Sequence, residues 1–334
     1  MRVPLRFPAL VCWPAAAAAV RLLLVTLLAT TCVPARLGAQ RSAESQAPDL
    51  REVVTKTIED TYAYSAGSEL AVEGEKAEIF VETWAKQQIS VRVVMTARHP
   101  QLERAKAEIE NLEFLTEVAG KKIFLRNRRK DPDAKPESEL TVEYYITLPE
   151  ECPVYLKSHF GGATISNLRN RLRINGEFSA INIDNVQGLL DIRTRFGDIV
   201  GEKIDGNVVI NARRSDIDLL DVGGTFTINA QYGELKLSPN LNMRDLRVNA
   251  DKSNVYIYEP IGGEGLAYEL ASNNGEMNLP DNRTLVELER TSEWRRIQIG
   301  PQQERSGTIS ASVTFGNLYL AKQQRVLEAR PTRF

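Results

Sequence analysis

Residues 174–237 decide the fold, because a short pattern recurs in them at a constant interval. The four copies read INGEFSAINI at 174–183, IRTRFGDIVG at 192–201, INARRSDIDL at 210–219 and INAQYGELKL at 228–237. In each copy, apolar or small residues alternate with polar residues on both sides of a central turn, a period of two that is typical of β-strands. One such unit cannot bury its apolar side chains alone, so the repeat indicates that successive units stack.

The repeat continues beyond this stretch when the first residue of each turn is numbered as position zero. Position zero is occupied by Phe160, Phe178, Phe196, Arg214, Tyr232, Lys252 and Asn274. Apolar residues recur four positions before and three positions after zero, small residues recur two before it, and glycine or asparagine recurs ten after it, where positive φ is expected. The sequence therefore predicts an all-β fold, a parallel β-solenoid with rungs of about 18 residues that stack about 4.8 Å apart.

Residues 60–322 are predicted to form one domain, in which residues 83–150 interrupt the repeat. The pattern fits residues 70–81 and, near the C-terminus, residues 315–320. We therefore expect an N-terminal rung to begin the solenoid and a C-terminal rung to close it. The interruption has the composition of a helix at 100–112 with additional strands, and we expect it to cover the open edge of the first rung.

Residues 1–39 are predicted to be a secretory signal peptide. Basic residues precede an uncharged apolar run, Leu22–Val33, and small residues follow near the expected cleavage site. Cys32 leaves a lipoprotein signal as an alternative. Residues 40–59 are expected to form a linker and residues 323–334 a C-terminal tail. The protein is therefore predicted to be exported, to the periplasm or to the cell surface.

The charge balance shows no basic excess. The chain has 334 residues, with 42 Lys and Arg against 44 Asp and Glu, and a net charge of −2. Removal of residues 1–39 takes away four arginines and no acid, which leaves 38 basic against 44 acidic residues and a net charge of −6. Neither a nucleic-acid partner nor an integral membrane protein is indicated. An unknown envelope component or a glycan is the expected partner.

No arrangement of residues typical of catalysis, cofactor binding or metal binding is recognisable. The chain has only two histidines, His99 and His159, and a single cysteine, Cys152, follows the predicted leader. Ser158 adjoins His159, but neighbouring residues on a strand point to opposite faces and cannot form a nucleophile–base pair. Zinc-type spacing and a phosphate-binding glycine loop are both missing. The sequence therefore predicts a protein that is not an enzyme and carries no cofactor or metal.

Three kinds of side chain recur at positions that are expected to face outward. Two positions after zero, Asp198, Asp216 and Glu234 form an acidic edge that could hold a ligand through a cation such as Ca²⁺, or could consist of solvated turn residues. Arg195, Arg213 and Arg214 are close enough in the repeat to neutralise this edge without a metal. Asparagines three before zero could hydrogen-bond along a solenoid or face a glycan. The aromatic residues at zero are expected to stack at a corner.

The turn sequences also resemble a known family. Phe196-Gly-Asp-Ile, Arg214-Ser-Asp-Ile, Gly-Asn-Val-Val-Ile at 206–210 and Val-Glu-Thr-Trp at 81–84 are similar to motifs of the bacterial "putative adhesin" domains of unknown function. The resemblance covers roughly residues 60–320. It implies an exported β-solenoid that has no established catalytic residues.

These observations lead to three hypotheses about function. The first is an exported, non-enzymatic β-solenoid that serves as a scaffold or adhesion module at the cell envelope. The second is a carbohydrate-binding or polysaccharide-cleaving solenoid that uses the acidic edge. The third is a solenoid that recognises a protein partner through its strand edges or its flat face.

Overall fold

The computed structural model describes residues 51–133, 135–281, 284–301 and 307–322. These residues lie in one compact unit, in which 21 strands are joined by backbone hydrogen bonds into a single sheet, with one α-helix and one short 3₁₀-helix. The predicted fold class, all-β, is confirmed. The predicted signal peptide at 1–39, the lipoprotein alternative at Cys32 and the predicted tail at 323–334 lie outside the described residues.

The strands and helices follow one another along the chain without long unstructured connections in the described ranges. Their bounds are β1 Glu52–Ala63, β2 Glu69–Glu75, β3 Ala77–Trp84, β4 Gln88–His99, α1 Leu102–Asn111, β5 Leu112–Ala119, β6 Lys122–Arg129, β7 Glu139–Pro149, β8 Val154–Ser166, β9 Leu172–Asp184, β10 Gln187–Arg195, β11 Ile199–Glu202, β12 Asp205–Arg213, β13 Ile217–Gln231, β14 Glu234–Asp251, β15 Asn254–Glu259, η1 Gly263–Gly265, β16 Leu266–Asn273, β17 Met277–Asn278, β18 Leu285–Arg290, β19 Trp294–Ile299, β20 Gly307–Thr314 and β21 Leu318–Lys322.

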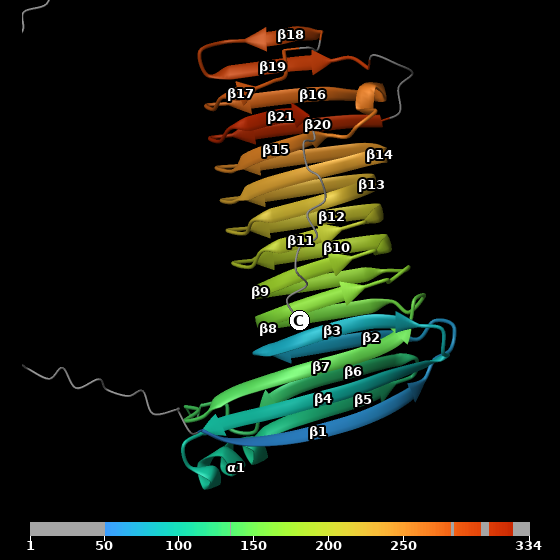
Figure 1. Ribbon diagram of the computed structural model, residues 1–334, viewed down its shortest axis with the longest axis vertical. Coiled ribbons are helices and arrows are strands. Elements are labelled where there is room, and N and C mark those ends of the chain that lie inside the picture. Colours follow the sequence, from blue (N-terminus) through green and yellow to red (C-terminus); the bar gives the residue numbers. More distant parts are fainter. Residues whose placement is uncertain (1–50, 134, 282–283, 302–306, 323–334) are drawn as a thin grey trace, which may run out of the picture. The chain divides into compact units, whose positions relative to one another are not determined.

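Parallel strands stack along most of this unit (Figure 1). In its middle part, residues at the same position of successive repeats are partners on adjacent strands, so that Ile174, Ile192, Ile210 and Ile228 lie one above another in β9, β10, β12 and β13. On the other side of each turn, β11 pairs with β9 and with β13 at the same offset. The number of residues in one repeat therefore equals the sequence separation between two residues that are partners on adjacent parallel strands.

The alternation read from the repeat matches the burial of the side chains. The apolar residues four positions before zero are all buried: Leu156, Ile174, Ile192, Ile210, Ile228, Val248 and Leu270. The residues three positions after zero are also buried, from Ala163 in β8 to Val255 in β15. Stacked aliphatic side chains therefore form a continuous core between the two halves of each turn, as the pattern predicts.

The backbone at position zero was not predicted. Positive φ was expected ten positions after zero and is found at the glycines there, for example at Gly188 and Gly206, with φ of 129° and 130°, but not at Asn170 and Asn242. Every residue at position zero, from Lys76 to Phe315, also has a positive φ, between 49° and 59°, although none is glycine. This conformation costs a non-glycine residue roughly 1 kcal/mol. The polarity pattern reports which way a side chain faces and carries no information about φ.

Glycine follows position zero where successive rungs approach most closely. A Cβ atom at Gly197 would lie only 2.1 Å from the carbonyl oxygen of Ser179 in the neighbouring rung. The rungs on either side carry serine instead, and the hydroxyl of Ser215 accepts a hydrogen bond from the N–H of Gly197 at 3.2 Å. Alternating glycine and serine therefore allow the turns to stack tightly.

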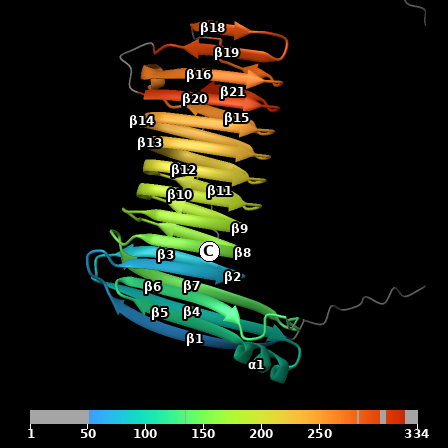
Figure 2. The same ribbon diagram turned by 180° about the vertical axis from the view of Figure 1, so that it is seen from behind.

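The interruption at 83–150 covers one end of the column (Figures 1 and 2). β6 and β7 pair in parallel with β2 and β3, β4 and β1 add antiparallel strands, and α1 packs against β1 and β4. The helix predicted at 100–112 is α1. The predicted linker at 40–59 is wrong in its second half, because β1 begins at Glu52. Only Val54, Ile58 and Tyr62 of β1 pack on the core, so the strand lacks a period-two apolar pattern.

The order of the rungs at the other end differs from the prediction. β20 and β21, from the C-terminal part of the chain, lie between β14–β15 on one side and β16–β17 on the other. Antiparallel strands β19 and β18 follow beyond β16. The prediction that the rung at 315–320 closes the column is therefore wrong. The pattern indicates which residues face inward, but several rungs have similar turns and nothing in it fixes their order.

Candidate functional site

Asparagines three positions before zero form a hydrogen-bonded row on the outer surface, here called the asparagine file. Nδ2 of Asn229 donates to Oδ1 of Asn211 at 3.0 Å, and Nδ2 of Asn249 donates to Oδ1 of Asn229 at 3.0 Å. The expected stacking of asparagines is confirmed over these three rungs. Asn175 departs from it, because its Nδ2 donates to the hydroxyl of Tyr155 at 3.0 Å.

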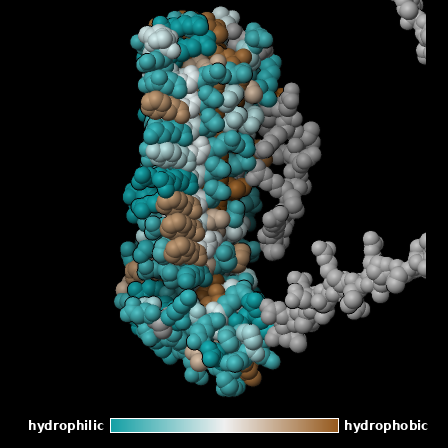
Figure 3. Space-filling model, turned by 90° about the vertical axis from the view of Figure 1, so that its left-hand side faces the viewer, coloured by the Kyte–Doolittle hydropathy of each residue, from teal (hydrophilic) through white to brown (hydrophobic). Residues whose placement is uncertain are grey.

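The residues at position zero form the predicted corner stack. The ring centroids of Phe160 and Phe178 are 4.9 Å apart and those of Phe178 and Phe196 are 4.8 Å apart, with nearly parallel planes. The guanidinium of Arg214 follows, 5.2 Å from the Phe196 centroid and 5.8 Å from that of Tyr232. The three phenylalanines remain 45%, 42% and 38% exposed. Hydrophobic and hydrophilic side chains accordingly alternate in blocks along one edge in Figure 3.

Charged side chains occupy the row one position before zero, which we call the charged row. His159 lies between two carboxylates, with Nδ1 2.9 Å from Oε2 of Glu75 and Nε2 3.7 Å from Oε2 of Glu177. Arg195 approaches the same Glu177, with 3.4 Å between Nη1 and Oε1. Arg213 pairs in register with Arg195 on the adjacent strand and has no ion pair with any described residue.

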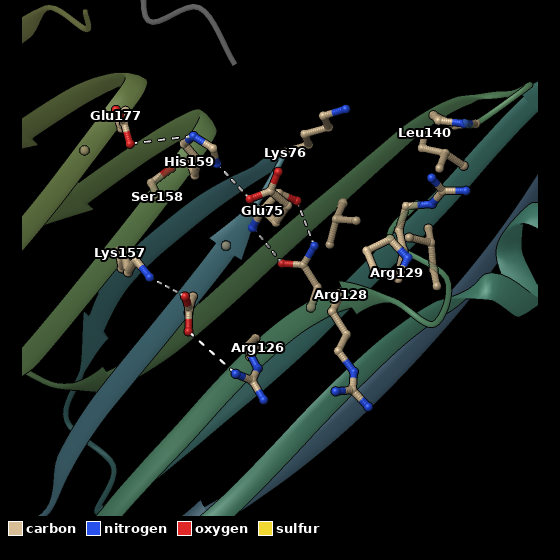
Figure 4. A pocket seen from close by; sticks show the side chains of 18 of the residues that line it. Glu75, Lys76, Arg126, Arg128, Arg129, Leu140, Lys157, Ser158, His159 and Glu177 are labelled. Atoms are coloured by element: carbon tan, nitrogen blue, oxygen red, sulfur yellow. Dashed lines mark hydrogen bonds and ion pairs between the residues drawn. The ribbon is translucent and has the colours of Figure 1, made fainter. Parts of the chain in front are cut away.

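A groove runs along the column and is lined by residues of the asparagine file and of the charged row. Its larger section has a volume of about 1300 Å³ and its smaller section about 640 Å³, and both are lined by Thr194 and Arg195. The larger section reaches the strands of the interruption, where Arg126 of β6 and Lys157 of β8 lie on either side of the same carboxylate, that of Glu73 (Figure 4). Nine Lys and Arg side chains and four Asp and Glu side chains line the larger section among the described residues.

The ion pairs in the larger section leave a small excess of positive charge, because Glu113, Glu108 and Asp191, which do not line it, pair with its arginines Arg128, Arg129 and Arg193. Glu73 lies between two cations, with Oε1 2.5 Å from Nζ of Lys157 and Oε2 4.0 Å from Nη1 of Arg126. Hydrogen bonding and charge attraction from Glu73 raise the pKa of Lys157, which keeps this ammonium group protonated. Lys76 lines the groove and has no ion pair with any described residue. The groove is therefore suited to negatively charged groups.

The predicted acidic edge is not part of this groove. Oδ1 of Asp198 accepts a hydrogen bond from the N–H of Asp216 at 2.9 Å, and Oδ1 of Asp216 accepts one from the N–H of Glu234 at 2.8 Å. Oε1 of Glu234 is 2.6 Å from Nζ of Lys236. In the described part of the chain, no three His, Cys, Asp or Glu side chains converge where a metal ion could bind. The edge therefore links successive turns to one another.

The remaining sequence candidates have no arrangement that favours catalysis. Cys152 is buried, and burial raises the pKa of its thiol to about 12, so the reactive thiolate is scarcely populated at neutral pH. Ser158 is buried whereas His159 is half-buried, so the two lie on opposite faces of the strand as expected. Nδ1 of His99 accepts a hydrogen bond from the N–H of Gln101 at 2.9 Å in an exposed turn.

The basic side of the groove was missed by reasoning from the sequence. Arg126 and Arg128 alternate with the buried residues Leu125 and Asn127, so their outward orientation was readable. Their position beside the charged row depends on the parallel pairing of β6 with β2, which places Arg126 opposite Glu73. No spacing in the sequence indicates that pairing, because the interruption lacks the repeat.

In the described ranges, no helix combines the length and the apolar character needed to cross a membrane. No protein-family model matches the chain, and no curated protein matches it.

Several solved structures are similar to the chain at low sequence identity. A structure described as a putative adhesin from Parabacteroides merdae is 10% identical, with 81% of this chain and 97% of that chain covered and a TM-score of 0.43. One described as a putative lipid binding protein from Parabacteroides distasonis is 11% identical, with 80% and 97% covered and a TM-score of 0.44. One described as a putative cell adhesion protein from Clostridium sporogenes is 10% identical, with 80% and 100% covered and a TM-score of 0.28. The descriptions of two of these three structures refer to adhesion.

Proposed function

We propose that the protein is a parallel β-solenoid, each rung one repeat of the sequence, that acts at the cell envelope as a non-enzymatic adhesion or scaffold module. The proposal includes export directed by residues 1–39 and one domain over residues 60–322, with β1 extending its start to Glu52. The parallel pairing of partners one repeat apart supports the solenoid, and the leader in the sequence supports export.

The continuous groove along the rungs is the observation that carries this proposal. The asparagine file and the charged row line it, so successive rungs present amide or charged groups at the same positions. The asparagine file suits an extended ligand with repeating units, because the rungs of Asn211, Asn229 and Asn249 each offer it the same amide group. Holding such a ligand requires no chemical step.

A glycan array probed with the protein, expressed as the full chain, tests the proposal. We expect saturable binding to one class of extended glycan, which is recovered at its original length after incubation. The double variant Asn211→Ala/Asn229→Ala should bind more weakly, because it removes amides that line the groove. The matched control Asn182→Ala changes an exposed asparagine outside the groove and should bind normally.

Two results would overturn the proposal. One is a shortened glycan, with the activity abolished by a single substitution, since the protein would then be an enzyme. The other is the lack of saturable binding to any glycan together with a specific protein partner in pull-downs from envelope extracts, which would favour recognition of a protein.

The alternative from the sequence, a carbohydrate-binding or polysaccharide-cleaving role at the acidic edge, has a separate test. A bound cation raises the melting temperature by mass action, so Ca²⁺ and EDTA should shift the melting temperature in opposite directions if Asp198, Asp216 and Glu234 hold one. We expect no shift, because Asp198 and Asp216 each accept a backbone hydrogen bond from the next rung.

A further inference from the structure

We propose that the groove binds an anionic polysaccharide, a glycan whose repeating unit carries a carboxylate or a sulfate. This inference rests on the proposed function and names the ligand class of the same site. The contact region runs from β6 of the interruption, across β2 and β8, to the charged row on β10 and β12. Figure 4 shows its part from Arg126 to Glu177.

The charge of the groove is opposite to that of the chain. The whole sequence has a small acidic excess, 44 Asp and Glu against 42 Lys and Arg. The larger section of the groove has nine Lys and Arg against four Asp and Glu among its described lining residues. A hollow lined mainly by one sign of charge concentrates ligands of the opposite sign. Arg128, Arg129 and Arg193 have carboxylate partners outside the lining, so the positive excess of this section comes from Lys76, Lys130 and Lys135, which form no ion pair with a described residue.

Two arginines in the charged row give the most specific indication. The parallel pairing of β10 with β12 places Arg195 directly beside Arg213, at the rung spacing of about 4.8 Å. Arg195 has a partner in Glu177, whereas Arg213 has no ion pair with any described residue. Like charges on directly opposite residues destabilise a sheet. A carboxylate or sulfate bound between the two guanidinium groups would remove that repulsion and accept hydrogen bonds from both.

Amide groups continue the site along the smaller section of the groove. Asn211, Asn229, Asn249 and Gln231 line it. A carboxamide has two N–H donors, and Asn229 and Asn249 each use one of them within the asparagine file. The second donor of each remains for a ligand. Arginines followed by a row of amides are suited to a polysaccharide that carries both acidic groups and hydroxyl groups.

The corner stack beside the groove disfavours a nucleic acid. Proteins that bind single-stranded nucleic acids stack the bases on the faces of aromatic side chains. Phe160, Phe178 and Phe196 cover one another's faces, so their ring edges are turned outward. The edge of an aromatic ring carries partial positive charge, which favours carboxylate or sulfate oxygens over bases.

Binding measurements by isothermal titration calorimetry test the inference on the protein expressed as the full chain. The probes are polygalacturonate, dextran sulfate, uncharged dextran and single-stranded DNA, each at low and high salt. We expect saturable binding to polygalacturonate, to dextran sulfate or to both, weakened by salt, and no binding to uncharged dextran. Comparison of the first two probes distinguishes carboxylate recognition from sulfate recognition.

The double variant Arg195→Gln/Arg213→Gln should bind the anionic glycan roughly tenfold more weakly, because two exposed ion pairs are lost. The matched control Arg247→Gln/Arg290→Gln removes the same charge from exposed residues that do not line the groove, and should bind normally. Because all four side chains are exposed, we expect both variants to fold. Thermal melts of both variants check this.

Equal loss of affinity in the two double variants, or equal affinity for DNA, would overturn the inference, because binding would then follow overall charge alone. Binding to uncharged dextran but to neither anionic glycan would overturn it while leaving the proposed adhesion function standing. If no glycan binds, either in the calorimetry or on the array, both the inference and the proposed adhesion function are overturned.

Discussion

Truncation of Ile181 to alanine should destabilise the folded protein by about 3 kcal/mol. Ile181 is fully buried and lies in register between Ala163 and Ile199 of the neighbouring rungs. The substitution removes three carbon atoms, and each buried carbon contributes about 0.8 kcal/mol to stability. The cavity that remains adds to the loss, because hydrogen bonds between rungs fix their spacing and prevent collapse.

A second substitution tests the packing around Ile181 directly. A Cβ atom at Gly176 would lie 3.2 Å from Cδ1 of Ile181, which is closer than ordinary van der Waals contact. Gly176→Ala alone should change the free energy of unfolding by less than about 1 kcal/mol, because crowding offsets the gain from a less flexible unfolded chain. In the Ile181→Ala background the crowding is relieved, and the same substitution should recover about 1 kcal/mol. The two sites should therefore be coupled by about 1 kcal/mol.

Urea denaturation of the four proteins in this cycle, followed by circular dichroism, measures the coupling. Asn182→Ala is the matched control, since Asn182 is the next residue on β9 and is exposed; its effect should stay within about 0.5 kcal/mol. Equal destabilisation by Ile181→Ala and Asn182→Ala would show that the assigned inward register is wrong. Strict additivity of Ile181→Ala and Gly176→Ala would refute the contact between these two residues.

Three further predictions concern the turns, the buried thiol and the asparagine file. Gly197→Ala should lower stability by about 3 kcal/mol in urea melts, because its Cβ would lie 2.1 Å from the Ser179 carbonyl oxygen, while Gly300→Ala, with no atom within 4 Å, should be nearly neutral. Burial raises the pKa of Cys152 from 9.0 to about 12, so stability should fall as pH rises through this window, in which only the unfolded thiol ionises. Cys152→Ala should remove that fall in melts compared at about pH 8 and pH 10; an unchanged slope would contradict it. Asn229→Ala breaks two hydrogen bonds and should cost about 1 to 2 kcal/mol, whereas a neutral effect would mean that the file adds no stability.

The repeat was sufficient to predict the inward and outward faces of the column, and the reason is physical. Ile174, Ile192 and Ile210 recur at a constant interval because each occupies the same place in its rung. The period of the sequence therefore predicts which side chains are buried. Side-chain polarity does not indicate the backbone dihedral angle φ. The positive φ of Phe178, in the left-handed region, was therefore not predicted. The order of the rungs that contain Asn274 and Phe315 was missed because their turns are similar.

The candidate site was only partly predictable, for a different reason. The rows of asparagines and of stacked aromatic rings follow directly from the repeat. The choice of Asp198 and Asp216 as a ligand edge assumed free carboxylates, whereas each accepts a backbone hydrogen bond from the next rung. The basic groove combines the charged row with Arg126 and Arg128, which a pairing between distant segments brings to it.

The insertion of β20 and β21 between β14–β15 and β16–β17 makes the column depend on a segment that is synthesised after the strands on both sides of it. A polypeptide that stops before Gly307 has the strands on both sides of the missing rung but not the rung itself. It exposes two unpaired strand edges, which are sites for aggregation and proteolysis. The ribosome must therefore synthesise residues 307–322 before this end of the column can close.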